Sequence, residues 1–309
     1  MKLFVSGLIN VETNLRVRSF PVTYYPIDYP FFGINASVSG VGYNISMATK
    51  TLGDEVAFSS LIGKDHEGVR VAQALDESGI ARNFVFDSLD ATPVSVILYE
   101  PGNGGRRQIY CDLKDIQEKT LDTDCVKSAM ASADICVLCN SNFNRALLPI
   151  AKEMGKLVAT DVHVLSDIHD PFNSDFMRFA DILFLSDEDL LCSPREFLTK
   201  LKSEYSAKII VIGLGDDGAI IYERATDAIT QLPIVDIGGV VNTVGAGDAL
   251  FSAFIHYYGG GKYGAVDALK RAEVFAALKI RHDGGAVGFS TESEVDEIAR
   301  VYEFKCATV

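Results

Sequence analysis

Residues 242–248 read Asn242-Thr243-Val244-Gly245-Ala246-Gly247-Asp248, and an apolar helical pattern follows them from residue 249 to residue 254. The two glycines let the backbone bend tightly and direct successive N–H groups at one point as the helix begins. The helix dipole adds positive charge at the same point. The stretch therefore predicts an anion site, and a phosphoryl group in transfer is a suitable occupant.

The carboxylate of Asp248 is unexpected beside a phosphate site, because like charges repel. Its position is explained if it removes the proton from an alcohol that attacks the phosphoryl group. The alternative is a glycine turn in which Asp248 only caps the helix. This stretch alone does not decide between the two interpretations.

The composition limits what the protein can be. A chain of 309 residues suits one large α/β domain, or one such domain plus a small appendage, and it can bury a full core. Its 28 Lys and Arg against 42 Asp and Glu give a net charge of −14, which disfavours nucleic acid or an anionic membrane as the main partner. Residues 1–7 read as a buried strand rather than a signal peptide, and no run of 18 apolar residues follows. We therefore expect a cytoplasmic protein.

Strand and helix patterns alternate through the middle of the chain, which is typical of βαβ units and a parallel sheet. The predicted strands cover residues 135–139, 157–160, 182–185 and 208–212, and the predicted helices cover residues 144–154 and 194–202.

Two segments break this alternation and predict a small β-sheet standing off the main domain. Residues 13–39 are broken by prolines, and the alternating runs 92–100 and 106–112 are joined by Pro101-Gly102-Asn103-Gly104-Gly105, a strong hairpin signal. Such a sheet could close over a ligand and exclude water. We expect a single domain over residues 1–309, with lid segments at about 13–39 and 91–112 inserted in it.

Several lid side chains have two interpretations. The aromatic ones are expected to pack within the lid, with stacking on a base or sugar as the alternative. The basic ones either pair with a phosphate or are solvated edge-strand charges. These residues are Tyr24, Tyr25, Tyr29, Phe31, Phe32, Arg106 and Arg107.

Further candidate ligand groups follow predicted strand ends, where open α/β sheets bind ligands. Asn10 and Glu12 come just after the first strand and share a face if the chain stays extended. The run Gly40-Val41-Gly42-Tyr43-Asn44 opens a helix, where small residues permit either close ligand approach or tight helix packing. The glycine turn from residue 213 to residue 218 leads into another strand, so it suits a loop against a flat or phosphorylated ligand rather than a dinucleotide fingerprint.

Together these pieces resemble the PfkB, or ribokinase-like, family of sugar and nucleoside kinases over nearly the whole chain. The first family signature is similar to Gly40-x-Gly42-x-Asn44 with Gly53 and Gly63 after it, although Ser39 stands where Gly or Ala is usual. The second, D-T-x-G-A-G-D followed by a helix of small residues, is similar to residues 242–255. Two signatures in the right order make chance agreement improbable.

The resemblance implies a three-layer α/β/α fold with a mostly parallel central sheet and a small β-sheet lid. It also implies phosphorylation of an alcohol by ATP with Mg²⁺. Asp248 is then the general base, and the amides of Gly245, Ala246 and Gly247 form the anion hole. The implied substrate-binding residues are Asn10, Glu12, Gly40, Gly42, Asn44 and Arg107. The implied nucleotide-binding residues are Ser186, Gly215, Gly218, Asn242 and Thr243.

The chain departs from the family pattern at several positions. Glu12 and Asn242 both replace a usual Asp, and the second of these Asp residues helps to hold a monovalent cation in ribokinase-like members. The sequence therefore does not decide whether K⁺ is a cofactor of this chain. An Asn at that position also occurs in sugar-phosphate kinases of the family, so an already phosphorylated substrate stays possible. The family motif N-x-x-E appears as Ser186-Asp187-Glu188-Asp189, where Asp189 is expected to contact Mg²⁺ through water. The motif D-x-N-x-R appears as Asp161-Val162-His163-Val164-Leu165.

The sequence thus predicts an ATP-dependent kinase of a small sugar. The alternatives are a nucleoside kinase of the same fold, favoured by the aromatic residues of the lid, and a non-catalytic sugar or nucleotide sensor, favoured by the two altered motifs. The intact Asp248 argues against a sensor. Family members often dimerise through the lid, so a homodimer is a further expectation.

Overall fold

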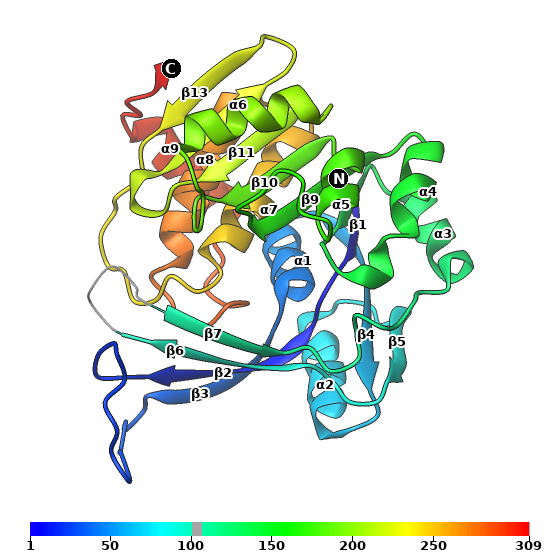
Figure 1. Ribbon diagram of the computed structural model, residues 1–309, viewed down its shortest axis with the longest axis vertical. Coiled ribbons are helices and arrows are strands. Elements are labelled where there is room, and N and C mark those ends of the chain that lie inside the picture. The colour runs from blue at the N-terminus through cyan, green and yellow to red at the C-terminus, as the bar shows by residue number, and fades with distance from the viewer. Residues whose placement is uncertain (101–106, 309) are drawn as a thin grey trace.

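The computed structural model describes residues 1–100 and 107–308. Its centre is a ten-stranded sheet with the order β14-β13-β12-β11-β10-β9-β8-β1-β4-β5 (Figure 1). The strands are β1 Lys2–Ser6, β4 Glu55–Gly63, β5 Phe84–Leu89, β8 Ile135–Leu138, β9 Leu157–Val164, β10 Ile182–Ser186, β11 Ile209–Gly213, β12 Ala219–Glu223, β13 Ala228–Leu232 and β14 Ala307–Thr308.

Every pairing from β5 to β11 in this order is parallel, and β12, β13 and β14 are added antiparallel at one edge. The parallel strands are nearly continuous apolar runs, as in Ile209–Gly213, because helices cover both faces of the sheet. The expected mostly parallel central sheet is confirmed.

The helices form two layers. One face of the sheet is covered by α1 Val41–Thr51, α2 His66–Ser78, α7 Ala246–Gly259, α8 Ala265–Lys279 and α9 Glu292–Val301. The other face is covered by α3 Thr123–Ser132, α4 Leu147–Glu153, α5 Ser174–Phe179 and α6 Pro194–Glu204. Successive side chains of β1 point to opposite faces of the sheet. Leu3 and Val5 therefore lie in the core beneath the first group of helices, and Phe4 lies in the core beneath the second. The fold is the expected three-layer α/β/α arrangement.

A second sheet of four strands lies below the central one in Figure 1, in the order β3-β2-β6-β7. Its strands are β2 Asn10–Arg16, β3 Ile34–Ser39, β6 Val94–Tyr99 and β7 Arg107–Asp112. β2 pairs antiparallel with β3 and parallel with β6, and β6 pairs antiparallel with β7. The expected pairing of the hairpin strands is therefore present, while the turn 101–105 and Arg106 lie outside the described residues.

The aromatic residues of the first inserted segment do not pack within this sheet, so that expectation is wrong. Tyr24 is 85% exposed and Phe32 is 99% exposed. Residues 17–33 form a loop outside the strands, and its prolines cannot donate to a ladder, which keeps the rings away from a core. Tyr29 and Phe31 stack on each other, with ring centres 6.2 Å apart.

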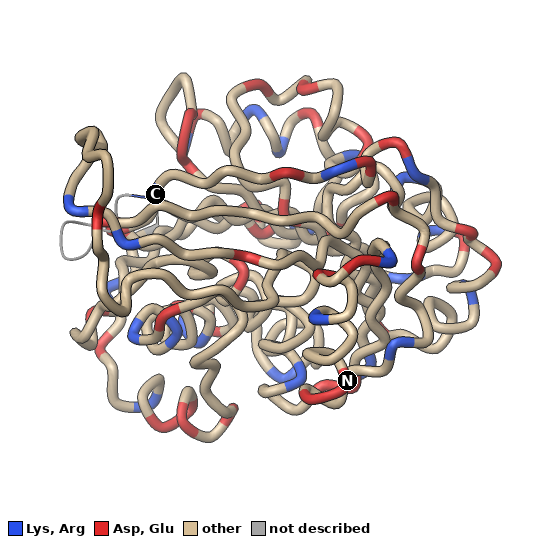
Figure 2. The backbone as a smooth tube through the Cα atoms, turned by 90° about the horizontal axis from the view of Figure 1, so that it is seen from below, with Lys and Arg blue, Asp and Glu red and all other residues tan. Residues whose placement is uncertain are grey.

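Within residues 1–100 and 107–308, no helix is both long enough and apolar enough to cross a bilayer. Figure 2 shows basic residues scattered among acidic ones in the view from below.

The helix predicted over residues 144–154 is shorter than expected. A 3-10 turn, Asn142–Asn144, comes first, and α4 begins at Leu147. The buried side chain of Asn144 donates to the carbonyls of Ser6 and Cys139, which ties this turn to the strand ends before the helix can start.

Candidate active site

The carboxyl ends of the parallel strands meet at one edge of the central sheet, and the small sheet leaves the fold from the same edge. β9, β10 and β11 end there at Val164, Ser186 and Gly213, and β2 starts four residues after β1 ends. This is the edge where open α/β sheets bind ligands.

Asp248 lies in the first turn of α7 and is held by the other signature. The Asn44 Nδ2 donates to Asp248 Oδ2 at 2.8 Å, across 204 residues of sequence. The hydroxyl of Ser39 in turn donates to Asn44 Oδ1 at 3.2 Å. The fold thus joins the two glycine-rich motifs through one hydrogen bond to the carboxylate.

The pKa of Asp248 is raised to about 6, first of all by burial. His163 and the hydrogen bond from Asn44 lower it, and the nearby charges of Asp161 and Glu12 raise it. An acid with a pKa near 6 is mostly ionised at neutral pH, yet it is more basic than an exposed aspartate. These are the properties that a general base requires.

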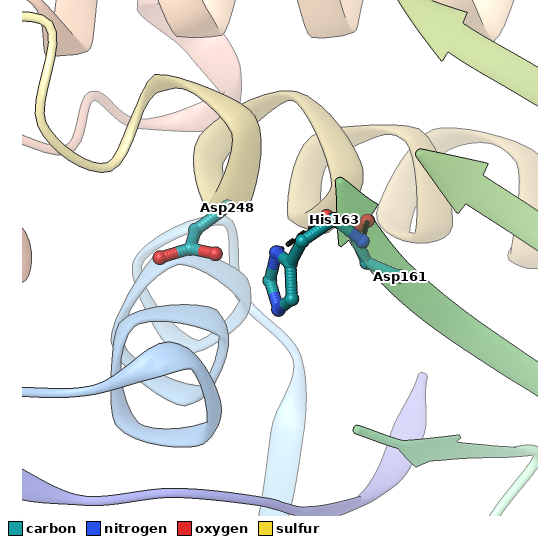
Figure 3. A group of neighbouring side chains, drawn as sticks. All are labelled: Asp161, His163 and Asp248. Carbon is teal, nitrogen blue, oxygen red and sulfur yellow. Dashed lines mark hydrogen bonds and ion pairs between the residues drawn. The ribbon is translucent and has the colours of Figure 1, made fainter. Parts of the chain in front are cut away.

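His163 belongs to the same cluster, as Figure 3 shows. Single ligand atoms of Asp161, His163 and Asp248 lie within 4.8 Å of one another. The backbone of His163 has φ 60°, and its N–H donates to Asp161 Oδ1 at 2.8 Å, so a tight turn at the end of β9 aims the ring at Asp248. This contact was not predicted, and its one signal in the sequence was the histidine at the Asn position of the D-x-N-x-R motif.

The turn before α7 presents free amides. Gly245 has φ 78° and is the N-cap, with no side chain to satisfy the first N–H groups. Among the described residues, the amides of Gly245, Gly247 and Asp248 have no backbone acceptor, whereas Ala246 N–H donates to Thr243 O at 3.2 Å. A Cβ added to Gly247 would meet no atom within 4 Å. Open space and unpaired amides at a helix start are suited to an anion.

The glycines of the first signature make close backbone packing possible. A Cβ at Gly40, where φ is 106°, would lie 2.7 Å from Leu8 O. A Cβ at Gly42 would lie 2.7 Å from the carbonyl carbon of Gly7, and Gly42 N–H donates to Leu8 O at 3.0 Å. These glycines seat the start of α1 against the turn that leads into β2.

Alternate residues of β2 present buried polar groups. Asn10, Glu12 and Asn14 are 3%, 6% and 1% exposed. Asn10 Nδ2 donates to Ser95 Oγ at 2.9 Å, and Asn14 Nδ2 donates to Glu12 Oε1 at 3.0 Å. The Oδ1 atoms of both asparagines accept no hydrogen bond from the described residues. Burial raises the pKa of Glu12, against hydrogen bonds from Asn14 and Ser39. The sequence analysis missed Asn14, which the alternation of Asn10 and Glu12 along a strand could have indicated.

The predicted nucleotide residues lie at the ends of β10 and β11. Ser186 pairs with Gly213, and its hydroxyl accepts from Glu188 N–H at 3.2 Å. Gly215 and Gly218 both have positive φ, at 55° and 88°. A Cβ on Gly218 would collide with the β13 backbone, whereas one on Gly215 would meet open space. Gly218 is therefore required by packing, and Gly215 leaves its loop open to a ligand.

Three consecutive carboxylates follow Ser186, and they are hard oxygen ligands of the type that Mg²⁺ prefers. Glu188 and Asp189 are exposed, and Asp187 is half-buried. Burial, with Glu188 and Asp217 nearby, raises the pKa of Asp187. This donor set fits a hydrated Mg²⁺ bound together with nucleotide phosphates.

Asn242 has a structural role in the loop before α7. Its Nδ2 donates to Asp283 Oδ1 at 2.8 Å, and its Oδ1 accepts from Val244 N–H at 2.9 Å. The side chain thereby ties this loop to the one that follows α8.

Arg107 reaches from the small sheet to the main domain. Its Nη1 donates to Thr243 Oγ1 at 3.1 Å, and its Nη2 lies 3.4 Å from Glu188 Oε1. The side chain is 33% exposed and lies beside the loop that carries the free amides. Arg107 thus contacts the main domain from an exposed position on β7, and its role stays a prediction.

A family model described as pfkB family carbohydrate kinase matches residues 2–292. The chain belongs to this family. A ribokinase of Dictyostelium discoideum is 20% identical over 94% of this chain and 98% of its own length.

Two solved structures show the same fold as this PfkB-family chain. A microbiome-derived acarbose kinase, Mak1, has a TM-score of 0.84 at 24% identity, covering 97% of this chain and 98% of its own. A ribokinase of Arabidopsis thaliana, complexed with ribose and ATP, has a TM-score of 0.77 at 19% identity, covering 97% and 99%.

Proposed function

We propose that this PfkB-family chain transfers the γ-phosphoryl group of ATP to a hydroxyl of a small sugar. One observation carries the proposal. The Asp248 carboxylate, held by Asn44, lies in a helix turn whose amides of Gly245, Gly247 and Asp248 have no backbone acceptor among the described residues. A base and an anion cradle on one turn are what in-line phosphoryl transfer to an alcohol requires.

In the reaction, the acceptor hydroxyl oxygen forms a bond to the γ-phosphorus while the bond between that phosphorus and ADP breaks. The hydroxyl proton passes to the carboxylate of Asp248. The amides at the start of α7 donate to the transferring oxygens, and the helix dipole favours the negative charge there. Ala246 contributes by shaping the turn, since its own N–H is bonded to Thr243.

The sugar is proposed to lie against the polar face of β2. The Oδ1 atoms of Asn10 and Asn14 and the carboxylate of Glu12 are acceptors, and sugar hydroxyls are donors. An unpaired buried acceptor costs free energy, so a ligand that supplies donors is favoured there. Gly40 and Gly42 support this site by setting the approach of α1.

The nucleotide is proposed to lie along the ends of β10 and β11, next to Thr243. Ser186, Gly215 and Gly218 border that position, and Asn242 shapes the loop beside it. Asp189, with Asp187 and Glu188, would hold Mg²⁺ through water. When bound, Mg²⁺ supplies positive charge to the phosphates. Arg107 supplies a fixed charge from the small sheet, beside Thr243.

The first experiment is ADP production from Mg-ATP with a panel of free sugars, sugar phosphates and nucleosides. One free sugar standing well above the rest supports the proposal, and a nucleoside in that position selects the nucleoside kinase. If no compound of the panel gives ADP production but some still raise the melting temperature, the kinase is refuted and the sensor is supported.

The substitution Gly247→Ala tests the anion cradle formed by the amides of Gly245, Gly247 and Asp248. The added methyl meets no protein atom, and alanine favours a helix over glycine by about 1 kcal/mol, so the fold should be as stable or more stable. Turnover should fall at least tenfold if a phosphoryl group occupies that space. Gly264→Ala is the matched control, because its Cβ also meets open space at the start of the neighbouring helix. Unchanged turnover in Gly247→Ala would refute the cradle.

A further inference from the structure

Lys279 is a buried cation that the proposed reaction has not yet used. It ends α8, and its side chain is 0% exposed. Its Nζ donates to Gly284 O at 2.7 Å and to Val244 O at 3.3 Å. In the described part of the chain no carboxylate oxygen lies within ion-pair distance of this ammonium. A buried charge needs compensation, and here backbone carbonyls provide it.

One carbonyl belongs to the loop that carries the anion cradle, and the other belongs to the loop after α8, which contacts it. Val244 directly precedes Gly245, the N-cap of α7. Gly284 precedes Gly285, whose carbonyl oxygen would lie 2.8 Å from a Cβ on Gly245. The ammonium therefore joins the two backbones next to the N-cap of α7.

Carbonyl oxygens from two loops are also how proteins bind a monovalent cation that has lost its water. In this chain the residues do not fit a soluble K⁺. The carbonyls of Val244 and Gly284 already accept from Lys279, and the amide of Asn242 is bonded to Asp283 and to the Val244 N–H.

Nearby carboxylates favour the protonated, positively charged form of Lys279. Burial lowers its pKa to about 8, while Asp248, Asp283 and Glu12 oppose that change. The same lysine lowers the pKa of Glu12. The positive charge is thus coupled to the carboxylates on both sides of the site.

We propose that Lys279 is a built-in cation, a positioning residue that holds the amide cradle and makes phosphoryl transfer independent of monovalent cations. The inference rests on the proposed function, since it assigns the lysine to the same site. It acts through the loop of Val244 and does not touch the reacting atoms.

The test compares Lys279→Ala, Lys279→Met and wild type in choline, sodium, potassium and ammonium chloride at constant ionic strength. Wild-type turnover should change less than twofold among the salts. Lys279→Ala should lose at least 30-fold in kcat in choline chloride, with a smaller change in the KM of the sugar, and ammonium or K⁺ should restore at least tenfold. Lys279→Met fills the space with an apolar chain and should not be restored. Lys270→Met, on the same helix but partly exposed, is the control and should behave as wild type.

Three results would overturn the inference: wild type that requires K⁺, Lys279→Ala that keeps full turnover in choline, or a folded Lys279→Ala that no cation restores. Melting temperatures give a second readout that needs no turnover. KCl should raise the melting temperature of Lys279→Ala relative to choline chloride and leave wild type and Lys270→Met unchanged. If no acceptor is phosphorylated at all, the proposed function fails, and the melting temperatures still decide whether the cation site exists.

Discussion

Replacing the proposed base with its neutral isostere, Asp248→Asn, should remove activity and raise stability in one step. A general base contributes about 100- to 10,000-fold to a rate, so kcat should fall by that factor. The binding of the sugar should change little, because the amide has nearly the same shape and can still accept from Asn44. Loss of function with a gain in stability distinguishes a functional carboxylate from one that only caps a helix.

The gain follows from the environment of the carboxyl group. The pKa of Asp248 is about 6, compared with 3.8 for an ordinary aspartate. A difference of that size corresponds to about 3 kcal/mol, and partial exposure reduces what is realised to about 1–3 kcal/mol. The folded chain holds this proton to higher pH than the unfolded chain. Wild type therefore loses stability as the pH rises from about 4 to about 6, and the variant does not.

Melting temperatures measured from pH 4 to pH 8 test this reasoning. The variant should melt about 2–6 °C above wild type at pH 7.5, and the difference should vanish near pH 4. Asp87→Asn, at an exposed position of β5, is the control and should show no such trend. The kcat/KM of wild type should fall tenfold per pH unit below about 6.

Two results would refute the argument. If Asp248→Asn melts below wild type at every pH, the carboxylate is a structural cap. If it retains more than a tenth of the wild-type kcat, another group is the base.

Three further predictions concern neighbouring groups. Asn44→Ala removes a hydrogen bond that lowers the pKa of Asp248, so the acidic limb of the kcat/KM profile should move to higher pH; an unmoved limb would contradict this. Arg107→Gln should lower kcat at least tenfold, with a melting temperature within 2 °C of wild type because its ion pair is exposed; equal kcat would leave the arginine outside the mechanism. We expect two copies to associate through the small sheet, where Val96 is 40% exposed, so Val96→Lys should reduce the mass measured by light scattering; a monomeric wild type or an unchanged mass would contradict this.

Local sequence determined the elements of this protein and most of its candidate groups. The alternation of strand and helix patterns through the middle of the chain predicted the parallel sheet. The glycines of the second signature predicted a tight turn at a helix start. The α7 turn around Gly245, with its φ of 78°, has that form. The roles assigned to these residues stay predictions until the variants are measured.

Contacts between distant segments were decided by tertiary structure. Whether Asp248 meets Asn44 or His163 depends on how α1, α7 and β9 converge at one sheet edge, which no spacing along the chain records. The carbonyl partners of Lys279 are hidden for the same reason, since in sequence it is one more lysine near a helix end. Periodicity specifies which face a residue occupies on its own element. Only tertiary packing decides which groups that face contacts, and these contacts determine the pKa of a buried group.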